Sequence, residues 1–177
     1  SVDTSMGLTP LAGIPMVTRS GDLDPSVVTF LMKKEGWTAE EAETILNKES
    51  GVFGMSMVSV DFRDIEAEAL AGGKQAKLAL DAYHYAIAGY IAKCAVAMEG
   101  IDVITFTAGV GEKSPYSRSE ICKYLEFLGV EISGKANLAR GEEAEISTPE
   151  SKVKVYVVPT NEELMIAKET EKIIKRN

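Results

Sequence analysis

The feature that most constrains the fold is an uninterrupted β-prone run, IDVITFT, at residues 101–107. A continuous apolar run suits a strand that is covered on both faces, so we expect a central strand of a sheet. In the preceding residues 74–99, apolar side chains recur at spacings of three to five, which predicts one long helix. A helix that leads into a buried strand indicates an α/β domain. The apolar stripe of the helix consists of Leu78, Tyr83, Ile87, Tyr90, Ile91, Cys94 and Met98.

Start and stop signals define further helices along the chain. Asp and Thr are good N-cap residues, Pro suits the first helical position, and Gly ends helices well. The predicted helices run from Pro25 to a stop at Gly36, from the TAEE box at 38–41 to near Lys48, from Pro115 to Leu128, and from the TNEE box at 160–163 to Ile174.

Two more β-prone runs, residues 130–133 and 153–158, are expected to add strands to the sheet. The segment between them is polar and acidic, so we expect it to be exposed. Residues 50–60 are broken by glycines and predict a loop with short extended pieces, and residues 1–20 are rich in Gly, Thr, Ser and Pro. The order of elements predicts an α/β fold with a mixed sheet flanked by helices.

The net charge excludes some classes of partner. It is −8, from 19 basic and 27 acidic side chains, which does not suit a nucleic-acid backbone. A single nucleotide remains compatible, because one or two cations and backbone N–H groups can hold it. No apolar run approaches the roughly 18 residues of a membrane span, and residues 1–7 lack the basic and apolar stretches of a signal peptide. We therefore expect no nucleic acid and no membrane as partners.

The cysteines and the single histidine limit the chemistry further. Cys94 and Cys122 are far apart, fit no metal spacing and lie in apolar helical patterns, so we expect small hydrophobic side chains in a reducing cytoplasm. His84 lies inside the long predicted helix, and we expect it to be structural. The chain starts at Ser1 without Met, inside what reads as a motif, so we expect it to be part of a longer protein.

The segment after the 101–107 run is the first candidate site. Gly109 and Gly111 would let the backbone come close to a ligand, and a helix start nearby favours an anion. The pattern is neither GxGxxG nor a P-loop, so a tight turn between strand and helix explains it equally well.

The second candidate is Arg19 within TRSGD. Its planar fork, among small residues, suits a phosphate. Taken alone, the pattern fits better a surface arginine paired with Asp22 or Asp24.

The third candidate is the stretch Asp61-Phe62-Arg63. A carboxylate can accept from ribose hydroxyls, and Phe or Arg can stack on a base. An aspartate cap beside a solvated arginine is the simpler explanation of the same residues.

The fourth candidate is Glu162. If Thr160 is the N-cap and Glu163 its reciprocal partner, Glu162 has no capping role. Its carboxylate could then hold Mg²⁺, although a favourable acid in a first helical turn is the ordinary explanation.

Five stretches together strongly resemble the acetate kinase family. They are SVDTSMGLTPL, TRSGDLDP, SVDFRDIE, FTAGVGE and PTNEE, in this order and at these separations. The resemblance covers the whole chain but only the C-terminal part of the family. It implies a ribonuclease H-like or actin-like ATPase domain of the sugar kinase–Hsp70–actin superfamily. Residues 1–177 would be the nucleotide-side domain, truncated within its N-terminal hairpin.

The resemblance also implies a reaction and its residues. Acetate kinases transfer the γ-phosphoryl group of ATP to acetate with Mg²⁺, giving ADP and acetyl phosphate, and the reaction runs readily in reverse. A cytoplasmic homodimer is also implied. The matching residues are Arg19 for the transferring phosphoryl group; Asp61, Phe62 and Arg63 around the adenosine; Gly109, Val110, Gly111, Glu112 and Lys113 against the nucleotide; and Glu162 for the metal.

Some features depart from the family pattern. Lys113, Val17 and Val60 replace a usual Asn, Gly and Ser. The family's second transition-state residue, a histidine, and its His-Leu-Gly-Asn-Gly hairpin would precede Ser1. We therefore expect this chain to bind nucleotide without turnover. The alternatives are part of a propionate kinase, or a binding and dimerisation module without catalysis.

Overall fold

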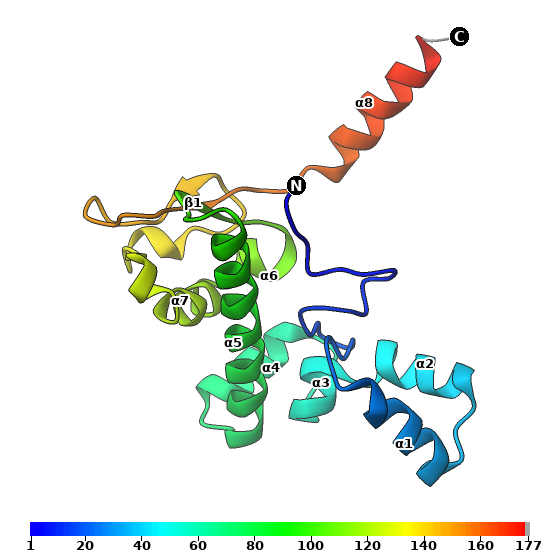
Figure 1. Cartoon of the computed structure of the whole chain (residues 1–177). Coiled ribbons are helices and arrows are strands. Elements are labelled where there is room, and N and C mark those ends of the chain that lie inside the picture. The colour runs from blue at the N-terminus through cyan, green and yellow to red at the C-terminus, as the bar shows by residue number, and fades with distance from the viewer. Residues whose placement is uncertain (176–177) are drawn as a thin grey trace. The chain divides into compact units, whose positions relative to one another are not determined.

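The computed structural model describes residues 1–175 and divides into two compact units. Unit 1 is Ser1–Ile101 with Lys123–Leu125, and unit 2 is Asp102–Cys122 with the chain from Glu126 onward. Figure 1 labels their elements. Among the helices of the described residues, none has the length and apolar character needed to cross a membrane.

Unit 1 is helical. Its elements are α1 (Pro25–Glu35), α2 (Ala39–Lys48), α3 (Gly51–Ser56), α4 (Phe62–Leu70) and α5 (Lys74–Ala97), and both α3 and α4 pack against α5 (Figure 1).

Local caps delimit the first two helices as predicted. Asp24 caps α1 by accepting from the Ser26 N–H at 2.8 Å. At the start of α2, the Thr38 hydroxyl accepts from the Glu41 N–H at 3.2 Å, and the Glu41 carboxylate accepts from the Thr38 N–H at 2.8 Å. The predicted capping box is therefore confirmed.

The buried face of α5 differs from the predicted stripe. The long helix is confirmed, but Leu78 is 62% exposed and Met98 is 49% exposed. Small side chains let neighbouring helices come close, and this determines which face of α5 is buried. His84 is fully buried on that face, as the prediction of a structural histidine requires. The buried residues of α5 are Ala76, Ala79, Leu80, His84, Ala88 and Ala95.

The prediction of a loop over residues 50–60 is wrong, because Gly51–Ser56 form helix α3. No side chain caps its amino end. Its first N–H groups instead donate to carbonyls of residues 16–18, more than 30 positions earlier in the chain. A helix whose cap comes from so distant a segment carries no local start signal.

Unit 2 contains a mixed three-stranded sheet, as predicted. Its strand order is β1 (Val103–Phe106), β3 (Lys154–Val157) and β2 (Ala144–Glu145). β1 runs parallel to β3, and β2 runs antiparallel to it. The helices of this unit are α6 (Ala108–Lys113), α7 (Pro115–Lys123) and α8 (Glu162–Ile174), with 3₁₀ turns at Glu126–Leu128 and Ala136–Leu138.

Two strand predictions are corrected. β1 lies at the edge of the described sheet, and only Ile104 and Phe106 of this strand are buried. The apolar run therefore has one covered face rather than two. Residues 130–133 form isolated bridges, Val130 with Val153 and Ile132 with Ser147, in place of a strand. Part of the segment expected to be exposed pairs with β3 as β2, and Ile146 in it is fully buried.

Two helix bounds in unit 2 are also corrected. The helix predicted over 115–128 ends at Lys123, and a 3₁₀ turn follows. The cap of α8 is Asn161, whose side chain accepts from the Leu164 N–H at 2.9 Å, and not Thr160.

Candidate functional site

Arg19 lies in a loop of unit 1 that backbone hydrogen bonds hold in place. The Arg19 carbonyl accepts from the Met16 N–H at 3.0 Å, and the Ser20 N–H donates to the Leu46 carbonyl at 2.9 Å. The Arg19 guanidinium donates a 3.4 Å hydrogen bond to the sulfur of Met16. This is a weak acceptor, so the guanidinium remains available for a stronger one.

Asp22, considered above as a partner of Arg19, makes other contacts. Its carboxylate accepts from the Gly13 N–H at 2.7 Å and from the Tyr90 hydroxyl. These two donors, Tyr90 first, lower the pKa of Asp22. Asp22 therefore joins the end of the loop to α5.

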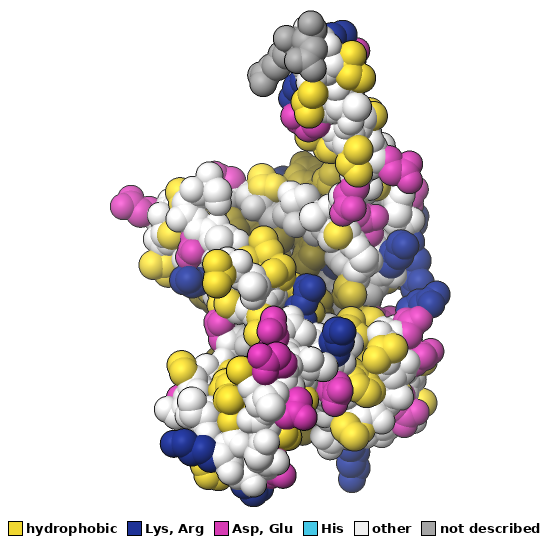
Figure 2. All heavy atoms as spheres, turned by 90° about the vertical axis from the view of Figure 1, so that its right-hand side faces the viewer, with side chains coloured by type: hydrophobic (Ala, Val, Ile, Leu, Met, Phe, Trp, Pro, Cys, Tyr) yellow, Lys and Arg dark blue, Asp and Glu magenta, His cyan; other side chains and the backbone are white. Residues whose placement is uncertain are grey.

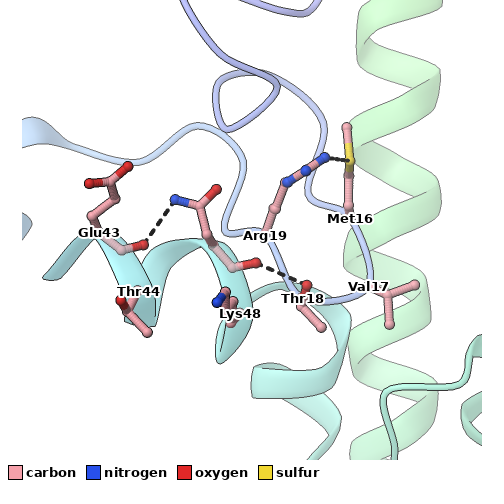
Figure 3. A pocket seen from close by; sticks show the side chains of 8 residues that line it. Met16, Val17, Thr18, Arg19, Glu43, Thr44 and Lys48 are labelled. Atoms are coloured by element: carbon pink, nitrogen blue, oxygen red, sulfur yellow. Dashed lines mark hydrogen bonds between the residues drawn. The ribbon is translucent and has the colours of Figure 1, made fainter. Parts of the chain in front are cut away.

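A pocket of about 640 Å³ opens beside the Arg19 loop (Figure 3). Arg19 and Lys48 contribute positive charge to its lining, and Thr18 contributes a hydroxyl that donates to the Asn47 carbonyl at 2.9 Å. In Figure 3 the Arg19 side chain extends from the loop toward Met16. The Glu43 carboxylate also lines the pocket, so the lining carries two positive charges against one negative charge. This balance is compatible with a small anion such as a phosphoryl group beside Arg19. The lining residues are Met16, Val17, Thr18, Arg19, Glu43, Thr44, Asn47 and Lys48.

Asp61 and Arg63 form a local pair at the start of α4. The Asp61 carboxylate caps the helix by accepting from the Arg63 N–H at 2.9 Å, and it also binds the Arg63 guanidinium. The Arg63 side chain, as the largest influence, lowers the pKa of Asp61 to about 2. The Arg63 side chain is 89% exposed, whereas Phe62 is buried, with its ring 5.3 Å from that of Tyr83. Of the two planar groups, Arg63 is therefore the accessible one.

The Gly109–Lys113 segment lies in helix α6 (Ala108–Lys113), in place of the tight turn considered above. The backbone turns into it at Ala108, which has a left-handed φ of 57°. The Glu112 side chain points back into the unit, where one carboxylate oxygen accepts from the N–H groups of Ala108 and Thr160, each at 2.7 Å. Glu112 is only 8% exposed. These donors, the Thr160 N–H first, lower the pKa of Glu112.

The same contacts explain the corrected cap of α8. Thr160 binds Glu112 through its N–H, and its hydroxyl lies 2.7 Å from that of Thr107. Asn161 is then the residue that caps the helix. Glu162 is the first residue of α8 and is exposed. The structure thus brings the start of α6 close to the residues that lead into Glu162.

The sequence interpretation missed Arg118, which is fully buried in α7. Its guanidinium donates to the carbonyls of Gly111 and Glu112 at 2.8 and 3.0 Å, and so binds the carboxyl end of α6. It also donates to the Asn137 side chain at 2.8 Å and to the carbonyls of Asn137 and Ala139 at 2.6 and 2.7 Å. Burial, and then the like charge of Arg140, lower the pKa of Arg118. No local pattern separates such a buried arginine from a surface one.

Few side chains of the described residues are placed to bind a metal ion. Within residues 1–175, no group of three or more His, Cys, Asp or Glu side chains is placed to hold a metal ion. Mg²⁺ is commonly held by one or two carboxylates together with water and substrate phosphates. A single exposed carboxylate at Glu162 fits that kind of site.

One face of the molecule shows how its charged side chains are distributed. On the face drawn in Figure 2, acidic and basic side chains are interspersed rather than gathered into a basic band. This distribution agrees with a small-molecule ligand rather than a long polyanion.

The fold is that of a domain of the actin-like ATPase class, as the solved structures that it resembles show. The chain is similar to the crystal structure of Porphyromonas gingivalis acetate kinase, with a TM-score of 0.90 and 48% identity over 96% of this chain and 43% of that one. It is also similar to the acetate kinase of Entamoeba histolytica, with a TM-score of 0.90 and 36% identity, covering 96% of this chain and 45% of that one.

Sequence comparison names the family. The model of the acetokinase family matches residues 1–168, and the chain therefore belongs to this family. It is 62% identical to the acetate kinase of Thermosipho melanesiensis and 60% identical to that of Fervidobacterium nodosum, over 99% of this chain in each case. The chain spans 44% of the length of these relatives.

Proposed function

We propose that this chain supplies the nucleotide-side part of an acetate kinase, which uses ATP and Mg²⁺ to convert acetate to acetyl phosphate. The observation that carries the proposal is the 62% identity to a curated acetate kinase over 99% of the chain. Because the chain spans 44% of that relative, the proposal for the chain alone is nucleotide binding without turnover.

Arg19 is the proposed catalytic residue. Phosphoryl transfer depends on positioning and on neutralising the charge of the phosphoryl oxygens. Supporting this role, Arg19 lines a pocket together with Lys48 and makes only a weak hydrogen bond to sulfur. Its planar fork suits two phosphoryl oxygens at once.

Asp61 and Arg63 are proposed to hold the adenosine. The Asp61 carboxylate is ionised at neutral pH, as an ordinary aspartate is, and an ionised carboxylate is a good acceptor for ribose hydroxyls. The exposed Arg63 guanidinium can stack on the base. Phe62, also predicted here, would act through its packing on Tyr83.

The Gly109–Lys113 helix is proposed to lie against the nucleotide. A side chain at Gly109 would meet no atom within 4 Å, so the backbone there is open to a ligand. Lys113 is exposed and adds a positive charge, and the inward-turned Glu112 would hold the segment rather than touch the ligand.

Glu162 is proposed to bind Mg²⁺ together with the nucleotide phosphates. When bound, the metal would neutralise phosphate charge. Thr160, which is tied to Glu112, holds the start of α8 and thereby the Glu162 carboxylate.

A second candidate is propionate kinase. The chain resembles a propionate kinase from Francisella tularensis subsp. tularensis SCHU S4, with a TM-score of 0.87 and 38% identity over 94% of this chain and 42% of that one. One methylene in an apolar pocket is worth only about 1–3 kcal/mol, and no residue proposed here lines an acyl pocket. A cytoplasmic homodimer is part of the same proposal and rests on the family resemblance.

Calorimetry of the chain with Mg-ADP tests the proposal. We expect saturable binding that weakens by about tenfold or more in Arg63→Ala, because stacking and charge are both lost. Arg140→Ala, which also removes an exposed arginine, should leave the affinity unchanged. Absence of binding would favour a module without a nucleotide site, and equal weakening in both variants would contradict the adenosine contact proposed for Arg63. Acetyl phosphate formation from acetate, or acyl phosphate formation from propionate, above a mock preparation would contradict the expectation of no turnover.

A further inference from the structure

The amino end of α3 is bound to the Arg19 loop through backbone atoms. The N–H groups of Ser50, Val52 and Phe53 donate to the carbonyls of Thr18, Met16 and Val17, at 3.0, 3.0 and 2.7 Å respectively. The first N–H groups of a helix have no partner within the helix, so they are free to bind another segment. The loop therefore supplies the cap that α3 lacks in its own sequence.

The loop is bound on a second side by the carboxyl end of α2. The Ser20 N–H donates to the Leu46 carbonyl, and the Thr18 hydroxyl donates to the Asn47 carbonyl, each at 2.9 Å. Arg19 thus lies between two residues whose backbone or side chain is bound to neighbouring helices. Its side chain is left to line the pocket shown in Figure 3.

Gly51 is the residue at which α3 and the loop come closest. Its φ is +60°, a conformation that glycine adopts readily and other residues rarely do. A Cβ atom at this position would lie 2.2 Å from the Met16 carbonyl oxygen and 2.6 Å from that of Arg19. Both distances are far inside van der Waals contact, and both atoms belong to the backbone, so no side-chain rotation could relieve the clash. Only glycine allows this approach.

We propose that Gly51 is a positioning residue for Arg19. Because it has no side chain, the amino end of α3 can bind residues 16–18 and hold the Arg19 backbone in one place. The part of this inference that concerns phosphoryl binding rests on the function proposed for Arg19. The part that concerns placement of the loop stands on the hydrogen bonds and on the space around Gly51.

A matched pair of variants separates the clash from simple backbone strain. Gly51→Ala adds a Cβ atom at a φ of +60°, where it meets the loop. Gly36→Ala adds one at a φ of +74°, at the end of α1, where nothing lies within 4 Å. Both variants force an alanine into a left-handed backbone conformation, which destabilises the fold. Only Gly51→Ala is expected to displace the Arg19 loop as well.

Amide hydrogen exchange in the full chain measures the placement directly. In Gly51→Ala we expect exchange at the Ser20, Val52 and Phe53 amides to be at least about tenfold faster, relative to buried amides of α5. In Gly36→Ala these amides should keep the wild-type rates. Equal behaviour of the two variants would overturn the inference. So would a Gly51→Ala chain that does not fold, because the glycine would then serve the fold as a whole.

Nucleotide binding provides the readout that loss of structure alone would not produce. A non-hydrolysable Mg-ATP analogue carries the third phosphoryl group that Arg19 is proposed to contact, and Mg-ADP lacks it. Arg19→Ala and Gly51→Ala should each lower the affinity for the analogue by about tenfold and leave the affinity for Mg-ADP unchanged. The double variant should lose no more affinity for the analogue than either single variant does. If Arg19→Ala does not change the affinity for the analogue, the role proposed for Arg19 fails. The exchange measurement then still tests whether Gly51 places the Arg19 loop. If Arg19→Ala weakens the analogue and Gly51→Ala does not, the inference is overturned.

Discussion

Two segments that carry proposed ligand residues, the Arg19 loop in unit 1 and helix α6 in unit 2, are each held within their own unit by different chemistry. The Arg19 loop is held mainly by backbone hydrogen bonds to the ends of α2 and α3. Helix α6 is held by two buried charged side chains, with Arg118 on its last carbonyls and Glu112 on the N–H group of Ala108 at its start.

The difference determines what each segment tolerates. A contact between backbone atoms survives most side-chain changes, but it fails when a Cβ atom separates the two chains. A contact made by a buried charged group fails when that group is removed, because several polar atoms then lose their partners. It also responds to pH where the group is a carboxylate. The following four experiments test this distinction.

The largest effect is expected from Arg118→Ala. The variant would leave the carbonyls of Gly111, Glu112, Asn137 and Ala139 without their donor inside the protein. We expect the free energy of unfolding to fall by about 3 kcal/mol or more, since each unsatisfied buried group costs about 1–3 kcal/mol. Urea unfolding followed by circular dichroism measures the loss. The exposed Arg140→Ala is the control, with an expected change within about 0.5 kcal/mol. A loss below about 1 kcal/mol for Arg118→Ala would mean that the buried guanidinium does not hold α6.

Cysteine labelling compares the reactivity of one thiol in each unit, first in the wild-type chain. Cys122 lies in α7 beside Arg118, and burial raises the pKa of its thiol to about 12. Cys94 lies half-buried on α5. Because only the thiolate reacts, iodoacetamide at about pH 8 should modify Cys122 at least about 100-fold more slowly than Cys94. Mass spectrometry of the peptides gives both rates. In Arg118→Ala the difference should shrink, and similar rates in the wild-type chain would contradict the burial of Cys122.

A smaller effect is expected where a side chain supports the Arg19 loop. Tyr90→Phe removes a donor to the Asp22 carboxylate, but Asp22 keeps the Gly13 N–H and is exposed to water. The free energy of unfolding should therefore fall by no more than about 1 kcal/mol. Tyr85→Phe, at an exposed tyrosine of α5, should have no effect in the same urea experiment. A loss above about 2 kcal/mol in Tyr90→Phe would show that this loop also depends on a side chain, and the contrast with α6 would fail.

The smallest effect is expected in the pH dependence of stability. The pKa of Glu112 is lower in the folded chain than in the unfolded one, so the ionised carboxylate stabilises the fold at neutral pH. This contribution is complete above the unfolded pKa of about 4.3 and is lost as the pH falls toward the lower folded value. As the pH falls below about 5, the free energy of unfolding should decrease less steeply in Glu112→Gln than in the wild-type chain. The exposed Glu131→Gln should keep the wild-type slope. If the free energy of unfolding of Glu112→Gln and of the wild-type chain changes in parallel with pH, Glu112 does not stabilise α6 through its charge.

Local signals in the sequence predicted those elements whose ends are capped by their own neighbours. The starts of α1 and α2 follow from Asp24 and from the Thr38–Glu41 box. Helix α3 was missed because distant carbonyls cap it. At α8, Thr160 and Asn161 are both suitable caps, and the contact of Thr160 with Glu112 decides between them.

The candidate site shows the same division. Arg19, Asp61, Arg63 and Glu162 are candidates because the short stretches around them resemble the family, although each one taken alone has a simpler explanation. No motif identifies Arg118, because its hydrogen-bond acceptors are backbone carbonyls and one side-chain amide from residues 111–139. The sequence predicts which residues are able to contact a nucleotide or its metal, but not which contacts hold those residues in place.

The sequence by itself therefore determined the family, the mixed α/β composition, the capped helices and the candidate ligand residues, since each depends on a few neighbouring positions. The tertiary structure alone decided the buried face of α5, the existence of α3, the inward turn of Glu112 and the central place of Arg118. The physical reason is common to all four. Buried polar groups must find partners and small residues allow close packing, and both conditions are met by segments that are distant in the chain.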